Sequence, residues 1–137
     1  MKYICLVYHD EARLQALSPA ELEALTDECG SWVKELGDHH VFSAGLQCVR
    51  TASTLRQHSG TLAMSDGPFA ETKEFLGGFT ILNARDLNEA IQLALKLPAV
   101  RIASIEVRPV LEPGAALSDP LDRKLVAAMR GKKHSSV

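Results

Sequence analysis

The chain has 137 residues, of which 46% are hydrophobic and 23% are charged, a composition typical of one globular domain with its own core. Its net charge is −2, and acidic and basic residues are interspersed along the chain. That balance argues against nucleic-acid binding, which needs a concentrated basic surface. No apolar run is long enough to span a bilayer, which argues against a membrane protein.

The ends and the cysteines favour a cytoplasmic protein. The first residues lack the anatomy of a signal peptide and are expected to belong to the fold. The three cysteines, Cys5, Cys29 and Cys48, are odd in number, and no pair has the C-x-x-C spacing of a redox or metal motif. We therefore expect reduced structural thiols in a reducing compartment.

The N-terminal third predicts a strand, a loop and a helix. Residues 1–8 are apolar on both alternating faces, which indicates a strand buried on both sides of its sheet. Residues 9–17 are polar and read as a loop. Ser18, Pro19 and Glu21 then form a helix start, with Glu21 completing a capping box, and Gly37 is a plausible left-handed stop.

The middle of the chain predicts several short strands. Residues 41–49 and 51–57 are rich in β-branched and small residues, and residues 61–64 follow a turn signal at His58, Ser59 and Gly60. Residues 78–82 read as the next strand. Gly77 and Gly78 open it without side chains, which permits a bulge or a close backbone approach.

The C-terminal third predicts a second helix, a last strand and a tail. Asp86 and Glu89 suggest another capping box, and Pro98 ends this helix. The strand 103–108 is followed by Pro109, which is typical of a sheet edge. Residues 114–137 are expected to form a linker and a helix that begins at Asp119-Pro120 and ends at Gly131, with a frayed basic end at residues 132–137.

These elements predict an α+β fold, a ferredoxin-like βαββαβ arrangement with an extra central hairpin. Two helices cover only one face of an antiparallel sheet, yet the first strand is apolar on both faces. We therefore expect a homodimer that packs sheet face against sheet face. A monomer whose tail folds back over the sheet is the alternative. The tail helix could equally dock on a partner or pack on its own domain.

The richest stretch for chemistry runs from Asp66 to Phe79. Gly67 and Pro68 are turn residues, with Phe69 as a core anchor. Asp66 at a strand end beside an aromatic wall is a candidate general base. Thr72 and Lys73 are candidates for binding a substrate carboxylate, although a solvated loop explains Lys73 at least as well.

The same stretch carries a family resemblance. The motifs 66–74 and 76–79, supported by residues 1–3, 44–47, 84–90 and 106–109, resemble the DGPF branch of the YCII-related domain family. The resemblance covers residues 1–113, which we take as one domain, and implies a dimeric α+β barrel. The tail after Pro113 lies outside it.

The resemblance also implies a His–Asp pair in a pocket, whose aspartate corresponds to Asp66, and it includes relatives that act on chlorinated or hydroxylated ring compounds. The histidine could be His9, His39 or His40, of which His9, at the end of the first strand, is preferred. Tyr8 and Phe69 would wall the pocket as substrate-binding residues. No residue set has convincing metal spacing, and no cofactor fingerprint occurs, so neither metal nor cofactor is expected.

Two classes of function stay open on sequence. The first is a small cofactor-free enzyme of lyase, isomerase or dehydrohalogenase type, in which Asp66, with or without a histidine, moves a proton on a small organic acid. The second is a non-catalytic dimeric binding or accessory protein, since members of the branch are often encoded beside sigma factors. Asp66 beside a histidine in an open pocket would favour the first class.

Overall fold

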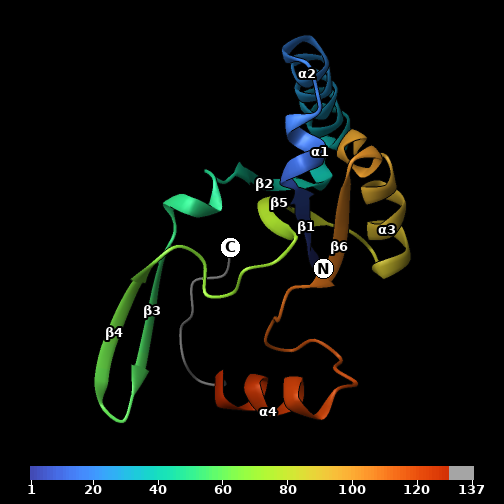
Figure 1. Cartoon of the computed structure of the whole chain (residues 1–137). Helices are drawn as coiled ribbons and strands as arrows, with labels where there is room; N and C mark the ends of the chain where they lie inside the picture. Colours follow the sequence, from blue (N-terminus) through green and yellow to red (C-terminus); the bar gives the residue numbers. More distant parts are fainter. Residues whose placement is uncertain (130–137) are drawn as a thin grey trace.

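The computed structural model describes residues 1–129. Figure 1 shows a main sheet with helices on one side, a projecting hairpin and a separate C-terminal helix. The main sheet is antiparallel with strand order β2-β5-β1-β6. Its strands are β1 (Lys2–Asp10), β2 (His40–Gly45), β5 (Glu74–Asn83) and β6 (Ala103–Pro109). This confirms the ferredoxin-like order predicted from the sequence, including the edge position of the strand that ends at Pro109.

The helices are α1 (Glu11–Gln15), α2 (Pro19–Leu36) and α3 (Leu87–Leu95), with short 3₁₀ turns at Gly37–His39, Val49–Thr51 and Pro98–Arg101. The predicted capping box at Ser18 is confirmed: its Oγ accepts from the Glu21 amide at 3.1 Å, and the Glu21 carboxylate accepts from the Ser18 amide at 3.2 Å. Gly37 follows α2 with a φ of +55°, which suits glycine.

One predicted boundary and one predicted capping contact were wrong. The expected loop 9–17 instead continues β1 to Asp10 and then forms α1, because the Asp10 carboxylate caps this short helix by accepting from the Ala12 amide at 3.0 Å. At the second helix, Asp86 accepts from the Glu89 amide at 2.9 Å. The Glu89 carboxylate, however, accepts from the Arg85 amide, so this capping box is shifted by one residue.

The core lies between the sheet and the helices α2 and α3. Trp32 of α2 is buried, and its Nε1 donates to the Leu93 carbonyl of α3 at 3.0 Å, which ties the two helices together. The buried apolar residues on this side come from the sheet, both helices and the Pro98 turn: Tyr3, Cys5, Trp32, Leu36, Leu82, Ala84, Ala90, Ala94, Leu97 and Ala99.

The opposite face of the main sheet is only partly covered. Leu6, Phe79, Ile81 and Phe42 share this face, because cross-strand partners in an antiparallel sheet point the same way. Ile81 is buried, but Phe42 is 49% exposed although its ring lies 6.0 Å from that of Phe79. The first strand is therefore apolar on both faces, as predicted, but the residues of one chain cover only part of the second face.

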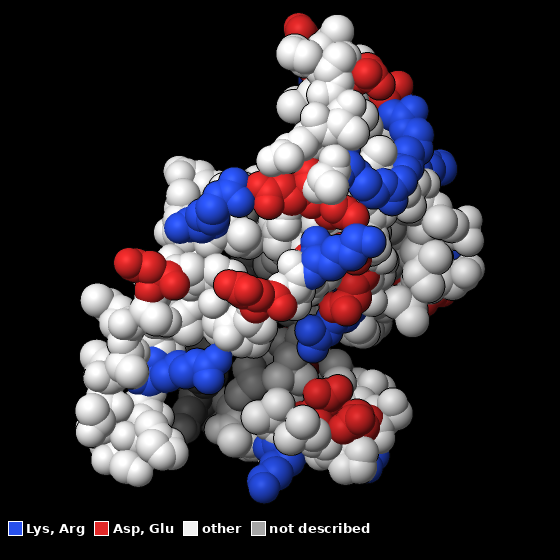
Figure 2. All heavy atoms as spheres, in the orientation of Figure 1, with Lys and Arg blue, Asp and Glu red and all other residues white. Residues whose placement is uncertain are grey.

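A second, two-stranded sheet is formed by β3 (Ser53–His58) and β4 (Thr61–Asp66). Positive φ angles at Ser59 and Gly60 close the turn, which confirms the turn signal there. This hairpin projects from the main body in Figure 1, and every side chain of β4 is exposed. Figure 2 shows few charged atoms over it, in contrast to the interleaved acids and bases on the main body.

The tail forms α4 (Pro120–Met129), which lies apart from α2 and α3 in Figure 1. Asp119 begins this helix as predicted, since its carboxylate accepts from the Leu121 amide at 2.8 Å. The predicted stop at Gly131 and the basic end 132–137 lie outside the described residues. Across residues 1–129, no helix combines the length and apolar character that crossing a bilayer requires.

Candidate functional site

A cavity of about 320 Å³ lies between α2 and the main sheet and is called the helix-side cavity. Its walls come from β1, α2, β2, β5 and the Pro98 turn. The chemically notable lining residues are His9, Cys29, Trp32, Ser43 and Thr80. Among the described residues that line it there is no Lys, Arg, Asp or Glu, so its surface is apolar with a few neutral polar groups.

His9 faces this cavity because it lies on the same face of β1 as Val7, and an irregularity in the neighbouring β5 makes room for its ring. The register between β1 and β5 shifts between Val7 and Tyr8, which leaves Gly77 without a partner. The imidazole of His9 lies against Gly77, where a Cβ would overlap the Cδ2 atom of the ring. The Phe75 ring lies 6.3 Å away at a tilt of 49°. The bulge and the missing side chain at Gly77 together make room for the His9 ring. This explains Gly77, one of the two glycines expected to permit a bulge or a close approach.

The surroundings of His9 change its chemistry. Its Nδ1 atom is buried, and within the described chain no group forms a hydrogen bond with it. Burial lowers the pKa of the His9 imidazole below its usual value, so the ring is neutral near pH 7. A buried nitrogen without a partner costs roughly 1–3 kcal/mol.

Cys29 is the other ionisable residue at this cavity. Desolvation by burial raises the pKa of its thiol, outweighing a backbone hydrogen bond that acts in the opposite direction. The thiol therefore stays protonated near pH 7. It is a wall of the cavity rather than a nucleophile.

Two hydroxyl groups at the cavity were not predicted. Thr80 Oγ1 lies 2.8 Å from Ser43 Oγ, and Ser43 Oγ lies 2.9 Å from His40 Nε2. The signal available in the sequence was Thr80, a polar residue between the apolar Phe79 and Ile81. His40 therefore joins a side-chain network, whereas His39 hydrogen-bonds the Asn83 carbonyl at 2.8 Å.

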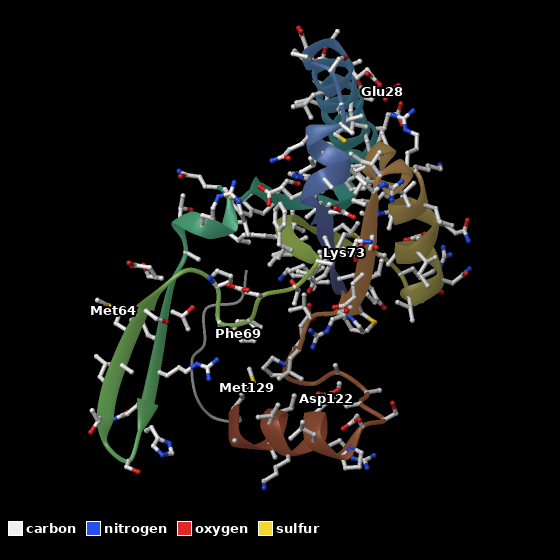
Figure 3. The ribbon with its side chains drawn as sticks, in the orientation of Figure 1. Glu28, Met64, Phe69, Lys73, Asp122 and Met129 are labelled. Atoms are coloured by element: carbon white, nitrogen blue, oxygen red, sulfur yellow. The ribbon has the colours of Figure 1, made fainter. Side chains whose placement is uncertain are left out.

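A second cavity of about 570 Å³ lies beside the loop that follows the hairpin. Three of the predicted substrate-binding residues, Tyr8, Phe69 and Thr72, line it. His9 lines the helix-side cavity instead, because neighbours on a strand point to opposite faces. Phe69 is 76% exposed, so the expectation that it anchors the core was wrong. Figure 3 shows its side chain on the loop between β4 and β5.

Lys73 and Thr72 form local contacts. The Lys73 Nζ lies 3.7 Å from an Asp10 carboxylate oxygen, and its side chain is largely exposed (Figure 3). Thr72 Oγ1 donates to the Glu74 carbonyl within the same loop. Lys73 does not line either cavity.

Asp66 ends β4 opposite Ser53 and is exposed. Within residues 1–129, no hydrogen bond or ion pair joins its carboxylate to another group, and it lines neither of the two cavities. The turn after it is well anchored: the amide of Gly67, at a φ of +92°, donates to the Ala52 carbonyl at 2.7 Å. The structure thus brings His9 to a cavity and leaves Asp66 outside it.

Metal binding finds no support in the described part of the chain. Residues 1–129 contain no group of three or more His, Cys, Asp or Glu side chains arranged to hold an ion.

Comparison with known proteins gives a family match. The sequence profile of the YCII-related domain matches residues 1–113. An uncharacterized protein of Rhizobium meliloti (strain 1021) is 34% identical over 114 residues, covering 80% of this chain and 92% of that protein. Among solved structures, 5-chloro-2-hydroxyhydroquinone dehydrochlorinase from Burkholderia phenoliruptrix AC1100, in complex with 2,5-dihydroxybenzoquinone, covers 80% of this chain and 93% of its own. At 15% identity and a TM-score of 0.43, this likeness is too distant to assign an activity.

Proposed function

The chain belongs to the YCII-related domain family, and we propose that it is a small cofactor-free enzyme that moves a proton on a small organic molecule bound in the helix-side cavity. The single observation that carries this proposal is His9, a half-buried histidine that lines that cavity and whose buried Nδ1 has no hydrogen-bond partner among the described residues. The finer assignment to the DGPF branch stays a prediction from the motifs 66–74 and 76–79.

His9 has the protonation state that a general base needs. Its lowered pKa keeps the ring neutral near pH 7, so a ring nitrogen can accept a proton from a C–H group made acidic by a neighbouring carbonyl. Return of that proton to another carbon completes an isomerisation. Departure of a leaving group with its bonding electrons completes an elimination. Both outcomes fall within the lyase, isomerase and dehydrohalogenase classes expected from the sequence.

The lining of the cavity favours an uncharged substrate. Among its described residues there is no lysine or arginine to pair with a carboxylate, so the lining offers a charged substrate no opposite charge. Trp32 offers an apolar wall, while His9, Ser43 and Thr80 offer neutral hydrogen-bonding groups. We therefore propose that the substrate is a small neutral ketone or hydroxylated ring, in place of the small organic acid expected from the sequence.

Asp66 has no part in this proposed proton transfer within one chain. Its exposed position at the end of β4 leaves it outside the cavity lining. The His–Asp pair that the family resemblance implies is therefore replaced, in our proposal, by His9 acting with neutral hydroxyl groups.

A homodimer through sheet faces is part of the proposal. Phe42 and Phe79 lie on the incompletely covered face of the sheet. The hairpin has a second apolar surface, because Leu55 lies opposite Met64 and shares its face with Leu62. A two-stranded hairpin is at best marginally stable alone in water, and a partner chain would cover both surfaces.

Sedimentation equilibrium tests the homodimer. We expect a dimer mass at micromolar concentration, weakened in Phe42→Ser because this change puts a hydroxyl into the sheet interface. Leu22→Ser, at an exposed position on α2 on the opposite side of the sheet, is the matched control and should keep the dimer mass. A monomer mass for the wild-type chain would contradict this part of the proposal.

Proton–deuterium exchange tests the chemistry directly. In D₂O, the wild-type protein should accelerate exchange of the α-protons of cyclohexanone, followed by NMR, because the ketone is neutral and small enough for the cavity. His9→Gln should lose about 10²-fold or more of that rate, the usual contribution of a general base. His58→Gln, which removes an exposed hairpin histidine, should exchange at the wild-type rate.

Two results would oppose the proposal. Equal rates for the wild type and His9→Gln would remove His9 as the base. Binding of cyclohexanone or phenol in the cavity without any accelerated exchange would favour the second function class, a dimeric binding protein without catalysis.

A further inference from the structure

A line of three polar side chains runs from the wall of the helix-side cavity to a histidine outside it. Thr80 and Ser43 line the cavity, whereas His40 does not. Two hydrogen bonds join these side chains. Thr80 Oγ1 lies 2.8 Å from Ser43 Oγ, and Ser43 Oγ lies 2.9 Å from His40 Nε2. Thr80 is the one buried polar residue within the described chain, at 6% exposure.

The sheet assembles this line through a second irregularity. Ser43 lies directly opposite Thr80 in the β2–β5 register, so their hydroxyls meet. His40 is three residues before Ser43 and would point to the other face of a regular strand. The register shifts between His40 and Phe42, which leaves Val41 as an extra residue in β2. This shift turns the His40 side chain to the same face as Ser43. Bulges that re-aim a side chain in this way are common next to active sites.

We propose that Thr80, Ser43 and His40 form a proton relay that serves the helix-side cavity. A ligand O–H group gives its proton to Thr80 Oγ1, the Thr80 proton passes to Ser43 Oγ, and the Ser43 proton passes to His40 Nε2. One proton leaves the ligand and one arrives on His40, so charge and atoms balance. The reverse sequence delivers a proton from His40 to the ligand.

Each hydroxyl group can pass a proton in either direction. A serine or threonine hydroxyl has one proton and two lone pairs, so each can donate to one neighbour while it accepts from the other. The protonation of His40 Nε2 then decides whether Thr80 presents an acceptor or a donor to the cavity. A rotation of two hydroxyl groups is sufficient to reverse the whole line.

The relay deepens the proposed function and rests on it, because it supplies the second proton-handling group that such an enzyme needs. His9 takes the proton from carbon, and the relay gives a proton to, or takes one from, the oxygen of the same substrate. Both groups line one cavity from different strands, His9 on β1 and Thr80 on β5. A neutral ketone offers an acidic C–H group to His9 and its carbonyl oxygen to Thr80.

NMR of ¹⁵N-labelled histidine tests the relay without any turnover. Saturating phenol should shift the His40 Nε2 resonance in the wild type, although His40 is outside the cavity, because the hydrogen-bond line transmits the contact. Thr80→Val removes the first hydroxyl at nearly equal volume and should abolish that shift. Thr80→Ser keeps a hydroxyl and should restore it. An unchanged shift in Thr80→Val would overturn the relay.

Exchange kinetics supply the second readout. In the cyclohexanone assay, Thr80→Val and His40→Gln should each lower the maximal rate by roughly 10²-fold while the apparent KM changes little, and Thr80→Ser should recover most of the rate. Wild-type rates in both variants would overturn the relay while leaving His9 as the base. No wild-type exchange, together with a phenol-induced His40 shift that Thr80→Val removes, would oppose the proposed function and support the relay.

Discussion

The sheet surface under α2 and α3 buries its side chains, whereas the β3–β4 hairpin buries almost none. Leu82 on β5 is fully buried, and Leu62 on β4 is 67% exposed. The same contrast separates the polar residues, since Thr80 is buried and Asp66 is exposed. Chemistry that depends on removal from water is therefore available on one side of the molecule only.

The difference also explains why a conspicuous motif need not be a catalytic site. Asp66 and its neighbours concentrate turn residues and charge in the sequence, but water surrounds this carboxylate. His9 is a single residue in an apolar strand, and burial alone lowers the pKa of its imidazole. A protein alters the reactivity of a group through its surroundings more than through the residues beside it in sequence.

The largest test of this contrast replaces leucine in both regions. Leu82→Ala should lower the free energy of unfolding by about 2–5 kcal/mol, because it opens a cavity in the core. Leu62→Ala should change it by less than about 0.5 kcal/mol at protein concentrations where the chain is monomeric. Urea unfolding at two protein concentrations measures the free energy of unfolding of both variants. A large, concentration-independent cost in Leu62→Ala would show that the hairpin belongs to the core.

A second test uses two glycines that lie opposite each other in the β2–β5 register. A Cβ at Gly78 would lie 3.0 Å from the Ala44 carbonyl oxygen, whereas one at Gly45 has no heavy-atom neighbour within 4 Å. Gly78→Ala should cost about 1–3 kcal/mol of stability through overpacking. Gly45→Ala is the control and should be neutral or slightly stabilising. Equal stability losses in the two variants would show that close strand packing does not explain the glycine at position 78.

A third test acts on Gly77, whose missing side chain makes room for His9. Gly77→Ala should displace the imidazole rather than unfold the protein, because the overlapping atom belongs to a side-chain ring that can rotate. We expect a stability loss of about 1 kcal/mol or less, together with a large change in the His9 ring resonances and in cyclohexanone exchange. Unchanged His9 resonances would contradict the proposed placement of the ring.

The smallest effect concerns pH. Because the folded state lowers the pKa of His9, the unfolded chain takes up the proton first as the pH falls below about 6.5. The stability contribution of neutral His9 is thus complete above that pH and is lost as the pH falls towards the folded-state pKa. His9→Gln should flatten the measured stability in this range. His58→Gln is the control, and equal flattening in both variants would oppose the assignment to His9.

Much of the fold follows from local sequence signals. The capping residues of α2, the Ser59-Gly60 turn and the edge strand at Pro109 were predicted because each depends on a few neighbouring residues. The loop before α2 was mispredicted because one carboxylate, Asp10, was sufficient to nucleate α1. Short helices of this kind leave little periodicity to detect.

The candidate site was harder to predict because two register shifts shape it. The bulge at Gly77 in β5 makes room for the ring of His9, which is on the helix side by regular alternation along β1. His40 reaches the helix side through the irregular pairing at Val41. Alternation along a strand gives no warning of such shifts. Sequence reasoning also placed Tyr8 and His9 at one pocket, although neighbours on a strand point to opposite faces, and the structure divides them between two cavities.

Trp32 has a further consequence for experiments. It is the single tryptophan of the chain, it is buried, and it forms part of the wall of the helix-side cavity. Its indole fluorescence therefore comes from one known place and is sensitive to whatever fills the space beside it. The protein contains its own optical reporter, so compound libraries can be screened against the unlabelled wild-type chain.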